Sequence, residues 1–163
     1  MSKHHAHAAH GLPDEQATEE LVALLNQTLA DTLDLAYQTK QAHWNVKGFN
    51  FYGLHLLFDE LHLQLAKFVD DFAERSVAIG GQALGTIRAA VDTSGIAEYP
   101  IHATDSRAHV DALVDRFGEY ASRIRHATKK AEKLGDPVTA DLYISVCRAI
   151  DKALWMLTAH QEA

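Results

Sequence analysis

The chain is poor in several residue types that mark particular classes of protein. Its single cysteine, Cys147, excludes an intrachain disulfide and is typical of proteins from a reducing compartment. No apolar run approaches the roughly 18 residues that a membrane-spanning helix needs. Residues 1–11 lack the apolar segment of a secretory signal. The single cysteine and the lack of a long apolar segment predict a cytoplasmic protein that makes no contact with a membrane.

Positive charge is also scarce. The 163 residues include 15 Lys and Arg against 22 Asp and Glu, which gives a formal net charge of −7. An acidic surface repels nucleic acid and attracts cations, so the charge disfavours simple DNA binding and favours the uptake of metal ions. At 47% hydrophobic residues, the chain is long enough for one domain with a full core.

Apolar residues recur at intervals of three and four over most of the chain, and no stretch alternates as a strand would. This periodicity predicts an all-α fold with four long helices at about 18–46, 54–79, 106–134 and 137–157. Thr18 and Asp105 are the predicted N-caps of the first and third helices, and Asp136 with Pro137 is predicted to begin the fourth. Short links join the first helix to the second and the third to the fourth.

A long link, residues 82–103, joins the second helix to the third. It has room for a short helix at 87–91 or at 93–97. One long crossover among four helices is typical of the ferritin-like four-helix bundle. We therefore expect a bundle domain over residues 18–163, preceded by a flexible, His-rich tail over residues 1–17.

Five side chains in the first two predicted helices have the chemistry of metal ligands: His43, His55, Asp59, Asp70 and Glu74. Two imidazoles with three carboxylates suit iron, and no thiolate accompanies them. The four ligands of the second helix fall at roughly 0°, 40°, 60° and 100° around its axis, so they share one face. The strip between them carries small or apolar side chains, which suits a buried interface better than a solvated surface.

One straight helix cannot bring both ends of this face to one metal ion, because Asp59 and Asp70 lie about 16 Å apart along the axis. The ligands are, however, symmetric about the midpoint between Gln64 and Leu65. An antiparallel copy of the same helix would place its Glu74 beside His55 and its Asp70 beside Asp59. The sequence therefore predicts a metal site that is built across a two-fold dimer.

The motif Ala42-His43-Trp44-Asn45-Val46-Lys47-Gly48, followed by His55-x-x-x-Asp59 and Asp70-x-x-x-Glu74, resembles the Dps family. These mini-ferritins are named for DNA-binding protein from starved cells. The stretch Ile150-Asp151-Lys152-Ala153-Leu154-Trp155-Met156 is similar to the family as well. Larger ferritins are disfavoured, because no Glu of this chain has a His three residues later.

The resemblance implies a hollow, tetrahedral dodecamer with two ferroxidase sites at each two-fold interface. His43, His55 and Asp59 would come from one subunit, with Asp70 and Glu74 from its partner. Fe²⁺ would be oxidised there, preferably by hydrogen peroxide, and the ferric product stored in the shell as a protection against oxidative damage. Zinc is a second candidate for the same ligands.

Three acidic residues near the junction of the third and fourth helices, Glu132, Asp136 and Asp141, resemble those that line the three-fold pore of Dps shells. The resemblance implies a route for iron through this pore. The alternative is that Asp136 acts only as an N-cap and Asp141 as an exposed acid of the first turn.

The tail suggests two further roles. His4, His5, His7 and His10 form a loose imidazole cluster that suits transition metals. Lys3 is its only basic residue of the Lys or Arg type, so we expect weak or absent DNA binding at neutral pH, with association appearing as the histidines gain charge towards pH 6. Two alternatives remain: a nucleoid-associated protein that compacts DNA, with iron chemistry secondary, and a helical interaction module without a metal.

Overall fold

The computed structural model describes residues 11–161, and this part of the chain contains helices and no strand. The helices are α1 (Glu15–Asn45), α2 (Phe51–Ala78), α3 (Ile87–Thr93), α4 (Ser106–Lys133) and α5 (Pro137–Ala159). Within the described range, no helix combines the length and the apolar composition that crossing a membrane requires.

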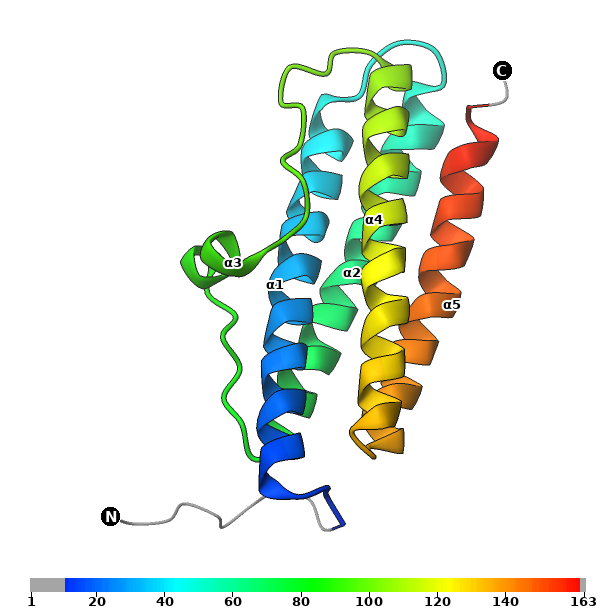
Figure 1. Cartoon of the computed structure of the whole chain (residues 1–163). Coiled ribbons are helices and arrows are strands. Elements are labelled where there is room, and N and C mark those ends of the chain that lie inside the picture. Colours follow the sequence, from blue (N-terminus) through cyan, green and yellow to red (C-terminus); the bar gives the residue numbers. More distant parts are fainter. Residues whose placement is uncertain (1–10, 162–163) are drawn as a thin grey trace.

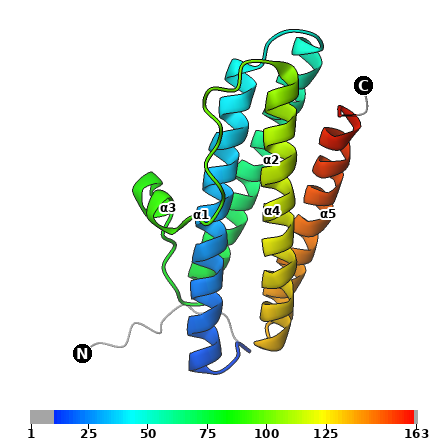
Figure 2. The ribbon, with the colours of Figure 1, turned by 45° about the horizontal axis from the view of Figure 1, so that its top comes forward.

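The four long helices lie side by side as a bundle made of two hairpins, α1 with α2 and α4 with α5 (Figure 1). The link from α2 to α4 returns along the outside of α1 over the whole length of the bundle and carries α3 midway (Figure 2). The predicted ferritin-like bundle with one long crossover is thus confirmed, and the short helix occupies the first of its two predicted positions.

The beginning of α1 differs from the prediction. Asp14, and not Thr18, is the N-cap, because its carboxylate accepts a hydrogen bond from the Ala17 amide at 2.9 Å. Thr18 lies inside the first turn and donates its hydroxyl proton to the carbonyl of Pro13. The helix therefore begins at Glu15, and most of the predicted tail lies outside the described residues.

The predicted starts of the last two long helices are confirmed, whereas α2 begins at Phe51, three residues before its predicted start. Asp105 accepts a hydrogen bond from the Ala108 amide at the start of α4, and Asp136 caps α5 with Pro137 in the first turn. Gly48 follows the end of α1 with a φ of 92°, a conformation that only glycine adopts without strain.

The centre of the bundle pairs its few polar groups internally. The Tyr143 hydroxyl lies 3.0 Å from the Thr28 hydroxyl, and the Tyr120 hydroxyl lies 2.7 Å from that of Thr32. Burial raises the pKa of both phenols, so they remain protonated. The rest of the centre is apolar, with buried leucine and phenylalanine side chains from all four long helices.

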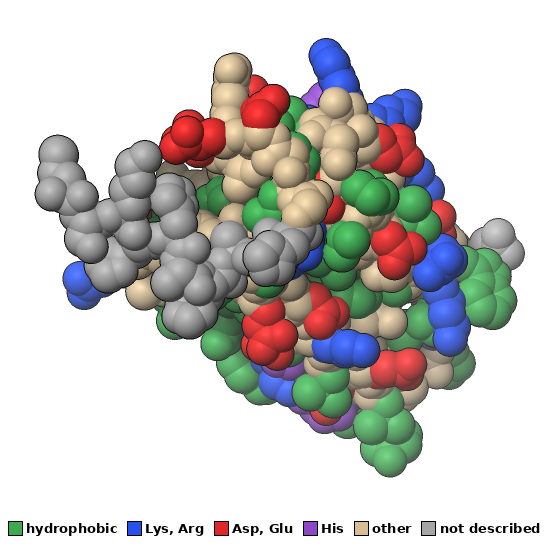
Figure 3. Space-filling view, turned by 90° about the horizontal axis from the view of Figure 1, so that it is seen from below, with side chains coloured by type: hydrophobic (Ala, Val, Ile, Leu, Met, Phe, Trp, Pro, Cys, Tyr) green, Lys and Arg blue, Asp and Glu red, His purple; other side chains and the backbone are tan. Residues whose placement is uncertain are grey.

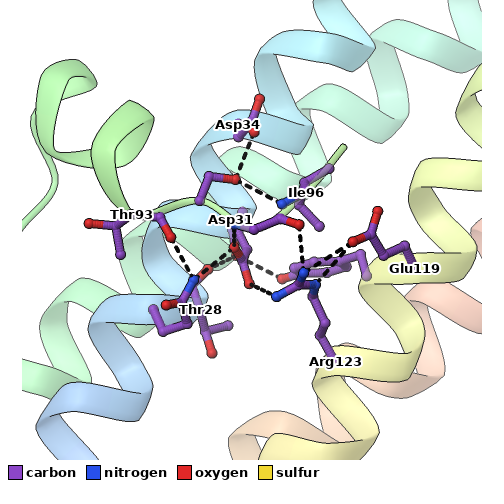
Figure 4. A network of polar contacts seen from close by, with 12 residues as sticks. Thr28, Asp31, Asp34, Thr93, Ile96, Glu119 and Arg123 are labelled. Atoms are coloured by element: carbon purple, nitrogen blue, oxygen red, sulfur yellow. Dashed lines mark hydrogen bonds and ion pairs between the residues drawn. The ribbon is translucent and has the colours of Figure 1, made fainter. Parts of the chain in front are cut away.

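A polar network fastens the crossover to α1 and α4 (Figure 4). The buried carboxylate of Asp31 accepts a hydrogen bond from the Gly95 amide at 2.8 Å and lies 3.7 Å from the Arg123 guanidinium. Burial raises the pKa of Asp31, and the Gly95 amide and Arg123 oppose that rise. Asp34 holds the Ser94 hydroxyl at 2.7 Å, so the segment after α3 is fixed at several points.

Candidate metal centre

His43 and His55 form a reciprocal pair where the end of α1 faces the start of α2. Nδ1 of His43 lies 2.8 Å from the carbonyl oxygen of His55, and Nδ1 of His55 lies 2.8 Å from the carbonyl oxygen of His43. Their rings stack with centroids 3.8 Å apart and an interplanar angle of 20°. The short turn between the two helices sets this register, so the rings are aligned before any ligand arrives.

The carbonyl partners decide which ring nitrogen carries the proton. A carbonyl oxygen only accepts, so each Nδ1 must donate its N–H. In the neutral ring, Nε2 then keeps its lone pair, which is the form that binds a metal ion. In both imidazoles the Nδ1 contact therefore leaves the lone pair of Nε2 available to a ligand.

Asp59 lies one turn after His55 and forms an ion pair with the Lys40 ammonium group. The hydrogen bond from Lys40 lowers the pKa of Asp59 below its ordinary value of 3.8, although partial burial acts in the opposite direction. The carboxylate is thus ionised at neutral pH and holds a protein cation. A metal ion that binds Asp59 would compete with this ammonium group for the carboxylate.

Asp70 and Glu74 lie farther along α2 and are exposed. Between them and Asp59 lie Leu63, which is 62% exposed, and the exposed Ala66. None of the residues from 11 to 161 covers this apolar strip or joins the two groups of candidate ligands. Among the described residues, no three His, Cys, Asp or Glu side chains lie close enough together to hold a metal ion.

The five side chains therefore have the donor atoms that suit iron, but they lie in two separate places within one chain. His43 and His55 contact each other near the α1–α2 turn, and Asp59 lies one turn after His55. Asp70 and Glu74 lie at the other end of an exposed apolar strip. The only cysteine lies on α5, so the site has nitrogen and oxygen donors without sulfur.

Comparison with known proteins identifies the family of this chain. The ferritin-like domain family matches residues 22–163. The chain is 43% identical over 144 residues to a DNA protection during starvation protein of Agrobacterium fabrum, covering 88% of this chain and 89% of that protein. This chain belongs to the Dps family of ferritin-like proteins.

Solved structures of the Dps family superpose on the whole bundle. DpsA14 from Streptomyces coelicolor shares 33% identity with a TM-score of 0.91, over 97% of this chain and 93% of that one. Dps from Vibrio cholerae shares 28% identity with a TM-score of 0.89, over 99% and 100%. The latter is described as a member of a broad superfamily of ferritin-like diiron-carboxylate proteins, which supports an iron-related function for this Dps chain.

Two contacts beside the candidate ligands were not predicted from the sequence: that of Lys40 with Asp59 and that of Ala36 with His62. Nδ1 of His62 lies 2.8 Å from the carbonyl oxygen of Ala36. This contact repeats that of His55 with His43, seven residues later on α2 and seven residues earlier on α1. The antiparallel register of the hairpin is the signal that finds them. Once His43 is set opposite His55, Lys40 falls opposite Asp59.

The three predicted pore residues differ in their surroundings. Asp136 is only 3% exposed; it caps α5 and forms an ion pair with Arg75 at 2.7 Å. Glu132 and Asp141 are exposed. Figure 3, which views the end of the bundle where α4 meets α5, shows acidic side chains interspersed with basic and apolar ones. The N-cap interpretation of Asp136 is confirmed, and the pore remains a prediction.

Proposed function

We propose that this Dps chain is a ferroxidase that oxidises Fe²⁺ with hydrogen peroxide and stores the ferric product in a hollow shell, protecting its cell from oxidative damage. One observation carries the proposal: the preset imidazoles of His43 and His55 lie beside an ionised Asp59. The missing carboxylates, Asp70 and Glu74, are displayed on the same helix, where a second copy would deliver them.

In this proposal a two-fold axis passes the middle of α2 and pairs the helix with an antiparallel copy. His55 and Asp59 of one copy then face Glu74 and Asp70 of the other, so each dimer has two complete sites. The exposed strip around Leu63 becomes the dry centre of the interface, with a gain of about 25 cal/mol for each Å² of apolar surface buried. Six such dimers would make the dodecamer that family likeness suggests.

The chemistry follows from the ligands. Each Fe²⁺ gives up one electron, and a peroxide molecule accepts two as its O–O bond breaks, so one peroxide oxidises two ions. Carboxylate oxygens favour the harder Fe³⁺ and thereby lower the energy of the oxidised state. Hydrolysis of Fe³⁺ releases protons, and the ferric oxyhydroxide accumulates as mineral. Zn²⁺ suits the same donors and would compete for the site.

A complementation experiment tests whether the site is shared between copies. His55→Ala damages one half of each site, and Asp70→Ala damages the other half. Neither homodimer therefore has an intact site. Dissociated and reassembled together, the two variants form mixed dimers with one intact site, and a random mixture should recover about a quarter of the wild-type rate of iron oxidation. The rate is followed by the absorbance of the ferric product after addition of peroxide.

Wild type and the double variant Asp59→Ala, Asp70→Ala are the controls. Equal rates for these two proteins would exclude the ferroxidase. A mixture that stays as slow as its separate components, despite confirmed exchange of subunits, would exclude a site between copies.

DNA compaction remains the second candidate, because several relatives are named for DNA protection. The net charge of −7 opposes it at neutral pH. His4, His5, His7 and His10 lie outside the described residues, so their role in DNA or metal binding stays a prediction. A gel-shift titration from pH 8 to 6 tests it: retention of DNA that grows as the pH falls supports a histidine switch, and an unchanged mobility excludes it.

A further inference from the structure

His62 is a histidine of α2 that lies outside the five proposed ligands. Its Nδ1 lies 2.8 Å from the carbonyl oxygen of Ala36, and a carbonyl oxygen only accepts. Nδ1 therefore donates its N–H, and in the neutral ring the lone pair of Nε2 is available to a ligand. Tyr37 packs edge-on against the imidazole, with ring centroids 6.2 Å apart and an interplanar angle of 66°. Two contacts from α1 thus fix the orientation of this ring.

The sequence sets this histidine beside Asp59. In His55-x-x-x-Asp59-x-x-His62, the carboxylate lies one turn after the first imidazole and one turn before the second. At about 100° per residue, His62 falls roughly 20° from His55 and roughly 60° from Asp59 around the helix axis. Side chains three and four residues apart are neighbours on a helix, so Asp59 lies between two imidazoles on one face.

The electrostatics agree with this placement. The hydrogen bond from Lys40 is the main cause of the lowered pKa of Asp59. His43 and His62, when they are protonated, lower that pKa further, so the carboxylate lies within electrostatic reach of both rings. Asp59 therefore attracts any cation that the His62 imidazole holds.

A carboxylate has two oxygen atoms and can bind two cations at once. On the side of His55, the cation is the ion of the proposed ferroxidase site. On the side of His62, a second cation would find an imidazole nitrogen and a carboxylate oxygen, donors that suit Fe²⁺ and Zn²⁺. Two adjacent ions also match the oxidation itself, because one peroxide molecule takes one electron from each of two Fe²⁺ ions.

The proposed antiparallel register leaves room for this second ion. The symmetry that sets Glu74 of one copy beside His55 of the other also sets Ala66 of the second copy beside Leu63, next to His62. The methyl group of alanine is small, so it takes little of the space beside the imidazole. A further carboxylate, that of Asp70 from the second copy, is one turn away.

We infer that His62 is a sixth ligand of the proposed metal centre, where its Nε2 and Asp59 together bind a second divalent transition-metal ion. The inference rests on the proposed ferroxidase site and adds a second ion position to it. The contact with the Ala36 carbonyl then serves to aim Nε2, as the carbonyl contacts of His43 and His55 do.

His62→Asn separates a metal ligand from a structural contact. The amide nitrogen of asparagine takes the place of Nδ1, so the variant still donates to the Ala36 carbonyl but has no Nε2. In isothermal titration with Zn²⁺, it should bind the second ion of each chain about tenfold more weakly than wild type, or worse. His126→Asn, which removes an exposed histidine of α4, is the matched control and should bind as wild type does. Circular dichroism and sedimentation confirm that each variant is folded and assembled.

Anomalous diffraction from wild-type crystals soaked in Zn²⁺ gives a second measurement that needs no variant. We expect two zinc peaks at each site, one of them about 2.1 Å from Nε2 of His62. Wild-type Zn²⁺ binding by His62→Asn, or the lack of a zinc peak at this nitrogen, would overturn the inference.

Titration of His55→Ala separates this failure from that of the proposed function. If His55→Ala loses the first ion while His62→Asn binds like wild type, the proposed ferroxidase site stands and its sixth ligand falls. If His55→Ala and His62→Asn both bind like wild type, the ferroxidase site and its sixth ligand fall together.

Discussion

The interior of the bundle and the outer face of the α1–α2 hairpin use polar residues in opposite ways. In the interior, Thr28 pairs with Tyr143 and Thr32 with Tyr120, all within one chain. On the outer face, His43 and His55 have their Nδ1 atoms bonded while each Nε2 is kept for a ligand. These hydroxyl groups inside the bundle find their partners within the chain, whereas the imidazoles on the face keep Nε2 available to a ligand.

This difference matters because ferritin-like di-iron proteins commonly place their Glu and Glu-x-x-His ligands in the bundle centre. Here tyrosine and threonine side chains fill that centre. In the proposed site the ligands lie at the surface, and no three of them come together among the described residues, so the site would depend on assembly. In the proposed function, iron oxidation is therefore restricted to assembled protein, next to the shell that receives the product.

We expect the largest loss of stability from breaking a buried ion pair in the interior. Asp136→Ala leaves the guanidinium of Arg75, which is 15% exposed, without its partner and removes the cap of α5. We expect a loss of about 4 kcal/mol in the free energy of unfolding. Urea denaturation at equal protein concentration measures it. The control Asp105→Ala removes an exposed cap and should cost about 1 kcal/mol; equal losses would show that the ion pair contributes nothing.

The same residue gives the stability a pH dependence. Burial raises the pKa of Asp136, but hydrogen bonds from Thr139 and Arg75 outweigh burial and hold the pKa below its ordinary 3.8. The folded state then binds this proton less readily than the unfolded state, so the stabilisation is present above pH 3.8 and is lost as the pH falls through the lower folded value. Wild type should lose stability more steeply than Asp136→Ala below about pH 4.

Next in size is a change on the outer face. His55→Ala removes one preset Nε2 from a half-buried position, so the rate of iron oxidation should fall at least about a hundredfold. The free energy of unfolding should change by less than about 1 kcal/mol, because no core contact is lost. Stopped-flow absorbance and urea denaturation give the two values. If His55→Ala lost stability but kept the wild-type rate of iron oxidation, His55 would have a structural role like that of the interior residues.

The complementary change in the interior is Tyr120→Phe. It deletes the hydroxyl that lies 2.7 Å from Thr32, whose own hydroxyl still donates to the Thr28 carbonyl. We expect a cost of about 1 kcal/mol in stability and an unchanged rate of iron oxidation. A slower rate in the folded variant would indicate that the interior takes part in the chemistry.

The smallest effect concerns the cation on Asp59. Lys40→Met keeps the length of the stem but removes the ammonium group that competes with a metal ion for Asp59. Divalent ions should then bind several-fold more tightly. Isothermal titration with Zn²⁺, which is not oxidised, measures the affinity, and Lys67→Met on the same face of the hairpin is the control. Weaker binding by Lys40→Met would mean that Lys40 supports the site instead of competing for it.

The accuracy of the sequence-based predictions varied with how local each feature is. Asp105 and Asp136 were predicted as caps because a short polar residue stands directly before a helical pattern. Thr18 was the wrong cap because two suitable residues, Asp14 and Thr18, precede the same pattern, and the folded chain uses Asp14. The spacing of His55, Asp59, Asp70 and Glu74 fixed their common helix face, because helical periodicity is a local property.

By itself, the sequence determined the helices, the long crossover, the ligand types and the symmetry of the ligands along α2. Tertiary structure alone decided how the helices meet. It set His43 against His55, placed the Lys40 ammonium on Asp59, fastened the crossover through Asp31 and left Gln38 Oε1 without a donor. These contacts depend on the register between helices far apart in the chain, and helical periodicity specifies which face a residue occupies but not which residue it meets.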